Sequence, residues 1–195
     1  MKNNKPDYKL ILPRISNWEG GIANNKNDYG GYTNRGISIY TWQALAPVLY
    51  GIPGNQDTLK TLKKEQWEGV VKYFWDKATY SNSINSQPVS EYFFECLWGQ
   101  GHCFNPQRVL NKLGYNLIID GVIGQNTINA VNDAISKNEE RLLFELHNRN
   151  LEHFQDLCKI DSRQKIFLQG WQNRENDLYI RAQKLLKNES VYEKR

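Results

Sequence analysis

Hydrophobic residues recur along the chain at the spacing of one helix face. The first series, at intervals of four, three and four positions, is Ile11, Ile15, Trp18 and Ile22. These intervals place the side chains on one side of a helix. Pro13 is tolerated in the first turn of such a helix, and Gly20 with Gly21 is expected to end it.

More apolar segments with helical spacing follow, over residues 39–49, 62–77, 89–98, 105–113, 125–135, 139–158 and 164–186. Glycine and proline residues between positions 50 and 57, and the polar residues 81–88, separate the earlier segments. Residues 115–123 have room only for turns or short strands. The pattern therefore predicts a mainly α protein.

Residues 23–38 interrupt the helical pattern. They contain glycine, asparagine, aspartate and threonine at a density typical of turns. We predict a loop or a short β-hairpin here, directly after the first helix. No flexible linker or repeat divides the rest of the chain. A change in composition near residue 99 favours a first region over 8–98 and a second helical region over 99–188, packed together as one compact body.

Composition excludes several classes of protein. A chain of 195 residues with 39% hydrophobic content can form one solid core. Its net charge of +4 is too small for a nucleic-acid-binding protein, and no basic stripe is present. The first residues lack the apolar segment of a signal peptide, and no run approaches the roughly 18 apolar residues of a membrane span. We expect a monomer made in the cytoplasm, with no nucleic-acid partner and no membrane insertion.

The cysteines do not indicate a disulfide framework or a metal site. Cys96, Cys103 and Cys158 lack the spacing of either. His102 lies beside Cys103, but two neighbouring residues are too few to hold a metal ion. We therefore predict no metal and no cofactor.

Glu19 and Asp28 are the strongest candidates for chemistry. Eight residues separate them, and cleavage of a glycosidic bond uses a pair of carboxyl groups in different environments. Glu19 lies at the margin of the first helix's apolar face, where partial burial would favour the protonated form that a general acid needs. Asp28 lies among polar residues and is expected to stay ionised. The structural alternative is an exposed glutamate at a helix end, which the helix dipole disfavours, and an ordinary turn aspartate.

The stretch that begins at Glu19 resembles the signature of glycoside hydrolase family 108, the phage-endolysin-type N-acetylmuramidases. That signature reads E-G-G-Y followed by D-x-G-G-x-T-N-x-G-I-[ST], and residues 19–22 and 28–38 match all of it except the tyrosine. Residues 72–76 resemble the family's Y-x-x-x-W-D region. Residues 120–127 resemble the D-G-x-x-G-x-x-T of its C-terminal peptidoglycan-binding region, and residues 170–174 resemble its G-W-x-N-R.

This resemblance implies a lysozyme-like helical fold and a secreted or phage-released lytic enzyme. The substrate would be cell-wall peptidoglycan, cleaved at the β-1,4 bond between N-acetylmuramic acid and N-acetylglucosamine. Residues 8–98 would form the catalytic region and residues 99–188 a peptidoglycan-binding region. Without a signal peptide, such an enzyme would reach the wall through a holin or a secretion system.

The resemblance also assigns roles to individual residues. Glu19 takes the position of the family's catalytic glutamate. Together with Glu19, the residues Asp28 and Thr33 resemble the Glu/Asp/Thr arrangement of phage T4-type lysozymes. This resemblance implies that Asp28 and Thr33 act on the water or on the sugar cation. Tyr32 and Asn34 would bind substrate, and Asn34 is also a candidate for the role given to Thr33.

Three positions depart from the family pattern. Ile22 replaces the usual tyrosine, and in the segment D-x-x-x-N-x-G the aspartate is Glu95 and the asparagine is Gly99. Gln100 is a candidate substitute for that asparagine in substrate binding. These departures leave two alternatives open, a peptidoglycan-binding protein without activity and a lytic transglycosylase that uses Glu19 without Asp28.

Overall fold

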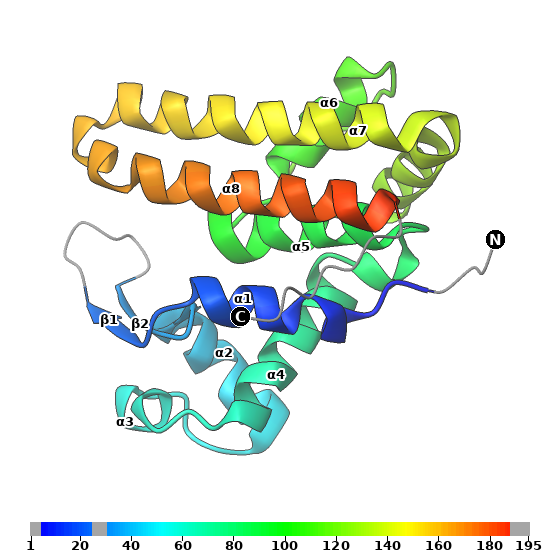
Figure 1. Cartoon of the computed structure of the whole chain (residues 1–195). Coiled ribbons are helices and arrows are strands. Elements are labelled where there is room, and N and C mark those ends of the chain that lie inside the picture. The colour runs from blue at the N-terminus through cyan, green and yellow to red at the C-terminus, as the bar shows by residue number, and fades with distance from the viewer. Residues whose placement is uncertain (1–4, 25–30, 188–195) are drawn as a thin grey trace. The chain divides into compact units, whose positions relative to one another are not determined.

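The computed structural model describes residues 5–24 and 31–187, which form two compact units (Figure 1). One unit spans Tyr8–Trp75. The other contains the described residues before Tyr8 and those from Asp76 onward. Asp28 lies outside the described residues.

The unit Tyr8–Trp75 combines short helices with a small sheet. Its elements are the 3-10 turn η1 (Tyr8–Leu10), α1 (Leu12–Trp18), β1 (Ile22–Asn24), β2 (Tyr32–Asn34), β3 (Ile37–Ser38), α2 (Ile39–Tyr50), α3 (Gln56–Lys60) and α4 (Lys64–Tyr73). The strands form an antiparallel sheet in the order β1-β2-β3. The predicted hairpin after the first helix is therefore present, with a third short strand added.

The first helix follows its sequence pattern, with one exception. Pro13 lies in the first turn of α1, and the side chains of Ile11 and Ile15 are fully buried. Ile22 was expected on the same face, but it lies in β1 and is 50% exposed. The helix ends at Trp18, so the chain is already extended when it reaches Ile22, and that part of the prediction was wrong.

The unit that follows Trp75 is helical. A π-helical turn η2 (Phe74–Ala78) joins α4 to it, and the later elements are η3 (Ser81–Ser83), α5 (Gln87–Gln100), α6 (Phe104–Lys112), α7 (Gln125–Ile160), η4 (Ser162–Gln164) and α8 (Lys165–Leu186). Helix α7 packs against both α6 and α8. Asn138 has non-helical backbone angles within α7, which agrees with the two separate helices predicted on either side of it. Residues 115–123 form no strand.

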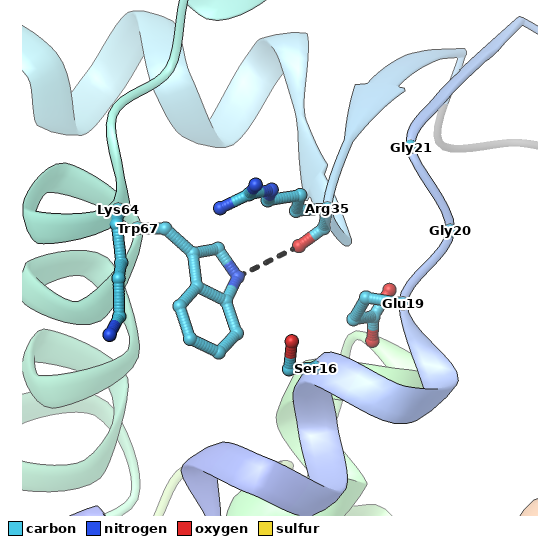
Figure 2. A pocket seen from close by; sticks show the side chains of 7 residues that line it. All are labelled: Ser16, Glu19, Gly20, Gly21, Arg35, Lys64 and Trp67. Carbon is cyan, nitrogen blue, oxygen red and sulfur yellow. Dashed lines mark hydrogen bonds between the residues drawn. The ribbon is translucent and has the colours of Figure 1, made fainter.

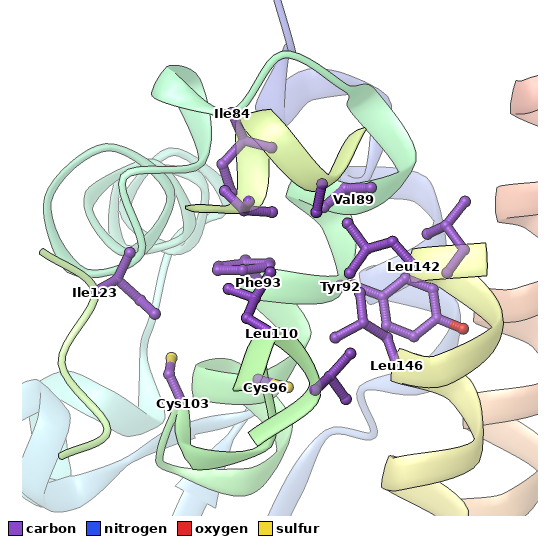
Figure 3. Packing of buried hydrophobic residues seen from close by; sticks show 14 of the residues in the cluster. Ile84, Val89, Tyr92, Phe93, Cys96, Cys103, Leu110, Ile123, Leu142 and Leu146 are labelled. Atoms are coloured by element: carbon purple, nitrogen blue, oxygen red, sulfur yellow. The ribbon is translucent and has the colours of Figure 1, made fainter. Parts of the chain in front are cut away.

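Helix α5 contributes many of the largest side chains to the core of this unit. Its Val89, Tyr92, Phe93 and Cys96 pack with Leu110, Leu142 and Leu146 from α6 and α7 (Figure 3). The fold class predicted from sequence, a mainly α lysozyme-like protein with a small β element after the first helix, is thus confirmed. Within the described residues, no helix is both long enough and apolar enough to cross a membrane.

Candidate active site

The predicted acid Glu19 lines a cavity of about 440 Å³ within the unit Tyr8–Trp75 (Figure 2). Its lining residues are Ser16, Glu19, Gly20, Gly21, Arg35, Lys64 and Trp67. They come from the end of α1, the turn between β2 and β3, and the start of α4. Figure 2 shows the Glu19 carboxyl group on one side of the Trp67 ring and Lys64 on the other.

The end of α1 fixes the backbone of Glu19. Its amide donates a hydrogen bond to the Ile15 carbonyl oxygen at 2.8 Å, and its ψ of 119° turns the chain from helix to extended conformation. Gly20 and Gly21 follow in open surroundings. Glu19 is thus the last residue that α1 holds, and its side chain is half-buried at the cavity wall.

Gly36 leaves the space that the Glu19 carboxyl group occupies. A Cβ atom at position 36 would lie 2.5 Å from the Glu19 Cδ and 2.9 Å from Oε1. Real Cβ atoms do not approach other groups so closely, so any side chain here would displace the acid. Gly36 also has a φ of 77°, which glycine adopts at little cost. Gly36 therefore allows both the backbone conformation of the turn and the observed position of the Glu19 carboxyl group.

The β2–β3 turn is a two-residue hairpin loop. Asn34 pairs with Ile37 across it, and Arg35 and Gly36 both have positive φ, as a type I′ turn requires. Arg35 has a φ of 49°, a costly conformation for a residue with a side chain. The Trp67 indole N–H donates to the Arg35 carbonyl oxygen at 3.0 Å. A buried tryptophan of α4 thus holds the strained residue from outside the hairpin.

Two other residues of the signature hold this hairpin. The buried Asn34 side chain donates to the Leu59 carbonyl oxygen at 2.8 Å, at the end of α3. The Ser38 hydroxyl caps α2 by accepting from the Thr41 amide at 3.1 Å. The Ser38 contact satisfies an amide that the start of a helix leaves without a partner, and the Asn34 contact ties the hairpin to the end of α3.

Three of the other predicted site residues do not line the cavity, and Asp28 is outside the described residues. Thr33 pairs with Ala23 and Ser38 in the sheet, and Tyr32 pairs with Asn24. Neither residue lines the cavity. Gln100 belongs to the other unit. Their roles stay predictions.

Four residues that line the cavity were not singled out from the sequence. Ser16 lies three positions before Glu19, and Arg35 occupies a variable position of the signature. Lys64 and Trp67 come from a separate helix, with no local signal that links them to Glu19. Arg35 lies within residues 23–38, whose density of turn formers predicted a loop or hairpin but no cavity.

Gln100 is part of a network of buried amides in the helical unit. Its Oε1 accepts from Asn105 Nδ2 at 3.0 Å, and its Nε2 donates to Asn150 Oδ1 at 3.1 Å. Asn150 in turn donates to Glu175 at 3.0 Å, and His147 contacts the same carboxylate at 3.1 Å. Both groups of the Gln100 side chain therefore have protein partners.

Glu95, one of the departures from the family pattern, forms an ion pair. It is 7% exposed, and its Oε2 lies 3.0 Å from the guanidinium of Arg174 in the G-W-x-N-R segment. Glu91, one turn earlier, pairs with Arg181 at 2.6 Å. These two pairs join α5 to α8. The longer side chain at position 95 thus has a structural partner 79 positions away.

The segment around Asp120 is a structural turn. The Asp120 Oδ1 accepts from the Val122 amide at 2.9 Å and from Gln107 Nε2 at 2.7 Å. Gln107 also accepts from the Gly121 amide at 2.8 Å. These hydrogen bonds lower the pKa of the Asp120 carboxyl group.

Burial in the helical unit shifts the pKa of two thiols and one histidine in the direction that favours their neutral forms. Burial raises the pKa of Cys103 to about 12, and it raises that of Cys96 as well. Burial and the neighbouring His102 lower the pKa of His153 to about 4. Among the described residues, no group of three or more His, Cys, Asp or Glu side chains is arranged to hold a metal ion.

Comparison with known proteins agrees with this architecture. Residues 12–101 match the family model described as glycosyl hydrolase 108, and residues 103–176 match the model described as predicted peptidoglycan domain. The structure of Brucella abortus SagA is similar over 91% of this chain and 94% of that chain, with a TM-score of 0.72 and 23% sequence identity. At this identity the likeness shows the fold alone. No curated protein matches the chain significantly.

The fold and the two matched segments define a glycoside hydrolase of the lysozyme-like class. The match of residues 12–101 to glycoside hydrolase family 108, followed by the peptidoglycan domain, confirms the resemblance seen in the sequence. Together, the hydrolase match and the peptidoglycan-domain match identify the chain as a peptidoglycan hydrolase. Along the sequence, the boundary between the two matched segments lies near residue 102. The boundary between the two compact units lies earlier, between Trp75 and Asp76. Helix α5 thus lies in the hydrolase match but packs in the helical unit.

Proposed function

We propose that the protein is an N-acetylmuramidase that cleaves the β-1,4 bond between N-acetylmuramic acid and N-acetylglucosamine, with Glu19 as the general acid. The position of the Glu19 carboxyl group carries this proposal. It lies at a cavity wall, at a helix end, in a space that Gly36 leaves open. The turn itself favours glycine at position 36, and the absence of a side chain there also leaves the room in which the Glu19 carboxyl group lies beside the cavity.

The reaction follows from this placement. The protonated Glu19 carboxyl group gives its proton to the glycosidic oxygen, and the bond from that oxygen to the muramic acid C1 breaks. Positive charge then develops on the sugar ring. Water adds to C1 and gives up one proton to a carboxylate of the site, which leaves a muramic acid with a reducing end. We assign Asp28 and Thr33 to the water or to the sugar cation, and Tyr32 to substrate binding, on the strength of the family signature.

Clearing of a peptidoglycan zymogram and analysis of the products by mass spectrometry test the proposal. The Glu19→Gln variant should lose activity by about 10²–10⁴-fold, the usual contribution of a general acid. Glu65→Gln is the matched control, since Glu65 is exposed on α4 and does not line the cavity. It should leave both folding and activity unchanged.

The products separate the proposal from its alternatives. Reducing muramic acid ends support hydrolysis, whereas anhydromuramic acid ends would assign the chain to the lytic transglycosylases. A well-folded wild-type protein that clears no peptidoglycan, yet sediments with it, would be a binding protein. Asp28→Asn adds a further distinction, because the hydrolase should lose activity and a transglycosylase should keep it.

A further inference from the structure

The Glu19 cavity carries two positive charges that proton donation does not require. Arg35 and Lys64 both line it, from the β2–β3 turn and from the first residue of α4. A neutral glycan of N-acetylated sugars offers these cations no charged partner. Their presence beside the acid therefore calls for an anionic group on the substrate.

Arg35 is the better defined of the two cations. Its backbone is held in a strained conformation by the Trp67 indole, and its amide also contacts the Gly21 carbonyl oxygen at 3.5 Å. Non-glycine residues in this region of conformational space cluster at functional sites. The Arg35 residue is exposed, and no carboxylate among the described residues forms an ion pair with its guanidinium. The fold thus accepts backbone strain to present this side chain at the cavity.

Lys64 adds a second charge from a separate element. It contacts Glu68 at 3.7 Å, but its side chain is 73% exposed, and such surface pairs are weak. Figure 2 shows the Arg35 side chain above the Trp67 ring, with Lys64 to one side of the ring and the Glu19 carboxyl group to the other. The lining of the cavity therefore carries one acidic and two basic side chains.

We propose that Arg35 and Lys64 bind a carboxylate on the muramic acid side of the substrate and so select peptidoglycan over uncharged glycans. This inference rests on the proposed function. Two sources supply such a carboxylate: the lactyl group of a muramic acid without peptide, and the acidic residues of the stem peptide. An arginine fork suits a carboxylate because it forms two parallel hydrogen bonds.

The test compares one polymer with and without its charges. Intact peptidoglycan, glycan strands freed of peptide, and peptidoglycan whose carboxyl groups are converted to methylamides are used as substrates. The variants are Arg35→Asn, which tolerates the left-handed backbone, Arg35→Lys, which keeps the charge, and Lys64→Gln. The matched control is Lys63→Gln, because Lys63 is exposed, is adjacent in sequence and does not line the cavity.

The expected result is a rise in KM on charged substrates with little change in kcat. Loss of a hydrogen bond to a charged group corresponds to about tenfold or more, so Arg35→Asn should raise KM by about tenfold. Lys64→Gln should raise it less, and Arg35→Lys should recover part of the loss. On the methylamide polymer all variants should match the wild type. An effect on peptide-free strands identifies the lactyl group, and an effect on intact peptidoglycan alone identifies the stem peptide.

Two results would overturn the inference while the proposed function stands. One is an active wild type with unchanged KM in both Arg35→Asn and Lys64→Gln. The other is an equal loss on charged and neutralised polymers. A wild type that cleaves none of the three polymers would instead refute the proposed function itself.

Discussion

Two glutamates beside glycines show how the two units use acidic residues differently. Glu19 ends α1 and faces a cavity, and its carboxyl group fills a space that Gly36 leaves open. Glu95 lies in α5, is 7% exposed and pairs with Arg174. Both belong to segments that resemble the family signature. A carboxylate buried against a guanidinium supports the fold, whereas one at a cavity wall lies where a bound substrate can reach it.

The same contrast holds for the surrounding residues. In the unit Tyr8–Trp75, signature residues such as Asn34 and Ser38 bond to backbone groups and so set the course of the hairpin. In the helical unit, buried side chains such as Glu91, Arg181 and Asn150 form ion pairs and hydrogen bonds to side chains of other helices. Substitutions in the first unit should therefore affect activity first, and substitutions in the second should affect stability first.

The largest effect is expected from Arg181→Met. This change leaves the Glu91 carboxylate, which is 1% exposed, without its guanidinium partner. Removing one member of a buried ion pair costs about 3–5 kcal/mol. Urea unfolding followed by circular dichroism should show this loss, while activity per folded molecule stays unchanged.

A double variant provides the control for that prediction. Replacing Glu91 by Leu together with Arg181→Met removes both charges, and apolar replacements of buried pairs are often neutral or stabilising. The double variant should recover most of the lost stability. If the single and the double variant unfold alike, the cost lies in packing, and the ion pair has little part in it.

Gly36→Ala should have the next largest effect, on activity. The added Cβ would lie 2.5 Å from the Glu19 Cδ, so the acid must move. A displacement of about 1 Å can reduce rates by about 100-fold, and we expect a loss of that size in kcat/KM. The left-handed backbone adds about 1–2 kcal/mol of destabilisation.

Gly51→Ala separates these two consequences. Gly51 has a φ of 64°, close to that of Gly36, but a Cβ there would meet no atom within 4 Å. It should lose similar stability and keep full activity. A similar fall in activity in both variants would show that strain in the backbone, and not contact with Glu19, is responsible.

The sequence predicted the helices and the acid because both depend on local patterns. Helical spacing located α2, α5 and α8, and the interruption near Asn138 was visible as a gap between two apolar segments. The glycine-rich signature located Glu19 at a helix end. Ile22 continues the helical spacing but follows Gly20 and Gly21, and the helix ends before these glycines, as they were expected to make it do.

The rest of the site depends on contacts between distant segments. The Trp67 indole reaches Arg35 across 32 positions, and Arg174 reaches Glu95 across 79. No periodicity or motif links such pairs. For the same reason the amide network around Gln100 could not be predicted, although each of its members is visible in the sequence.

Asn34→Ala should have a moderate effect and also tests the role predicted for this residue. The change removes the donor to the Leu59 carbonyl oxygen, and a lost hydrogen bond at a buried group costs about 1–3 kcal/mol. If Asn34 anchors the hairpin, thermal unfolding shows this loss and KM changes little at temperatures where the variant is folded. A raised KM with unchanged stability would instead support the predicted contact with substrate.

The smallest effect is expected at Gly99, where the family has asparagine. A Cβ at this exposed position would lie 3.6 Å from the Glu95 Oε2, an ordinary contact, so both Gly99→Ala and Gly99→Asn should fold. Alanine should stabilise α5 by about 0.5–1 kcal/mol, and asparagine by less. If the family's asparagine contacts substrate, only Gly99→Asn should raise activity, by a few-fold in kcat/KM. Equal activity of the two variants would show that the residue at position 99 has only a structural role, like that of Glu95 one turn before it.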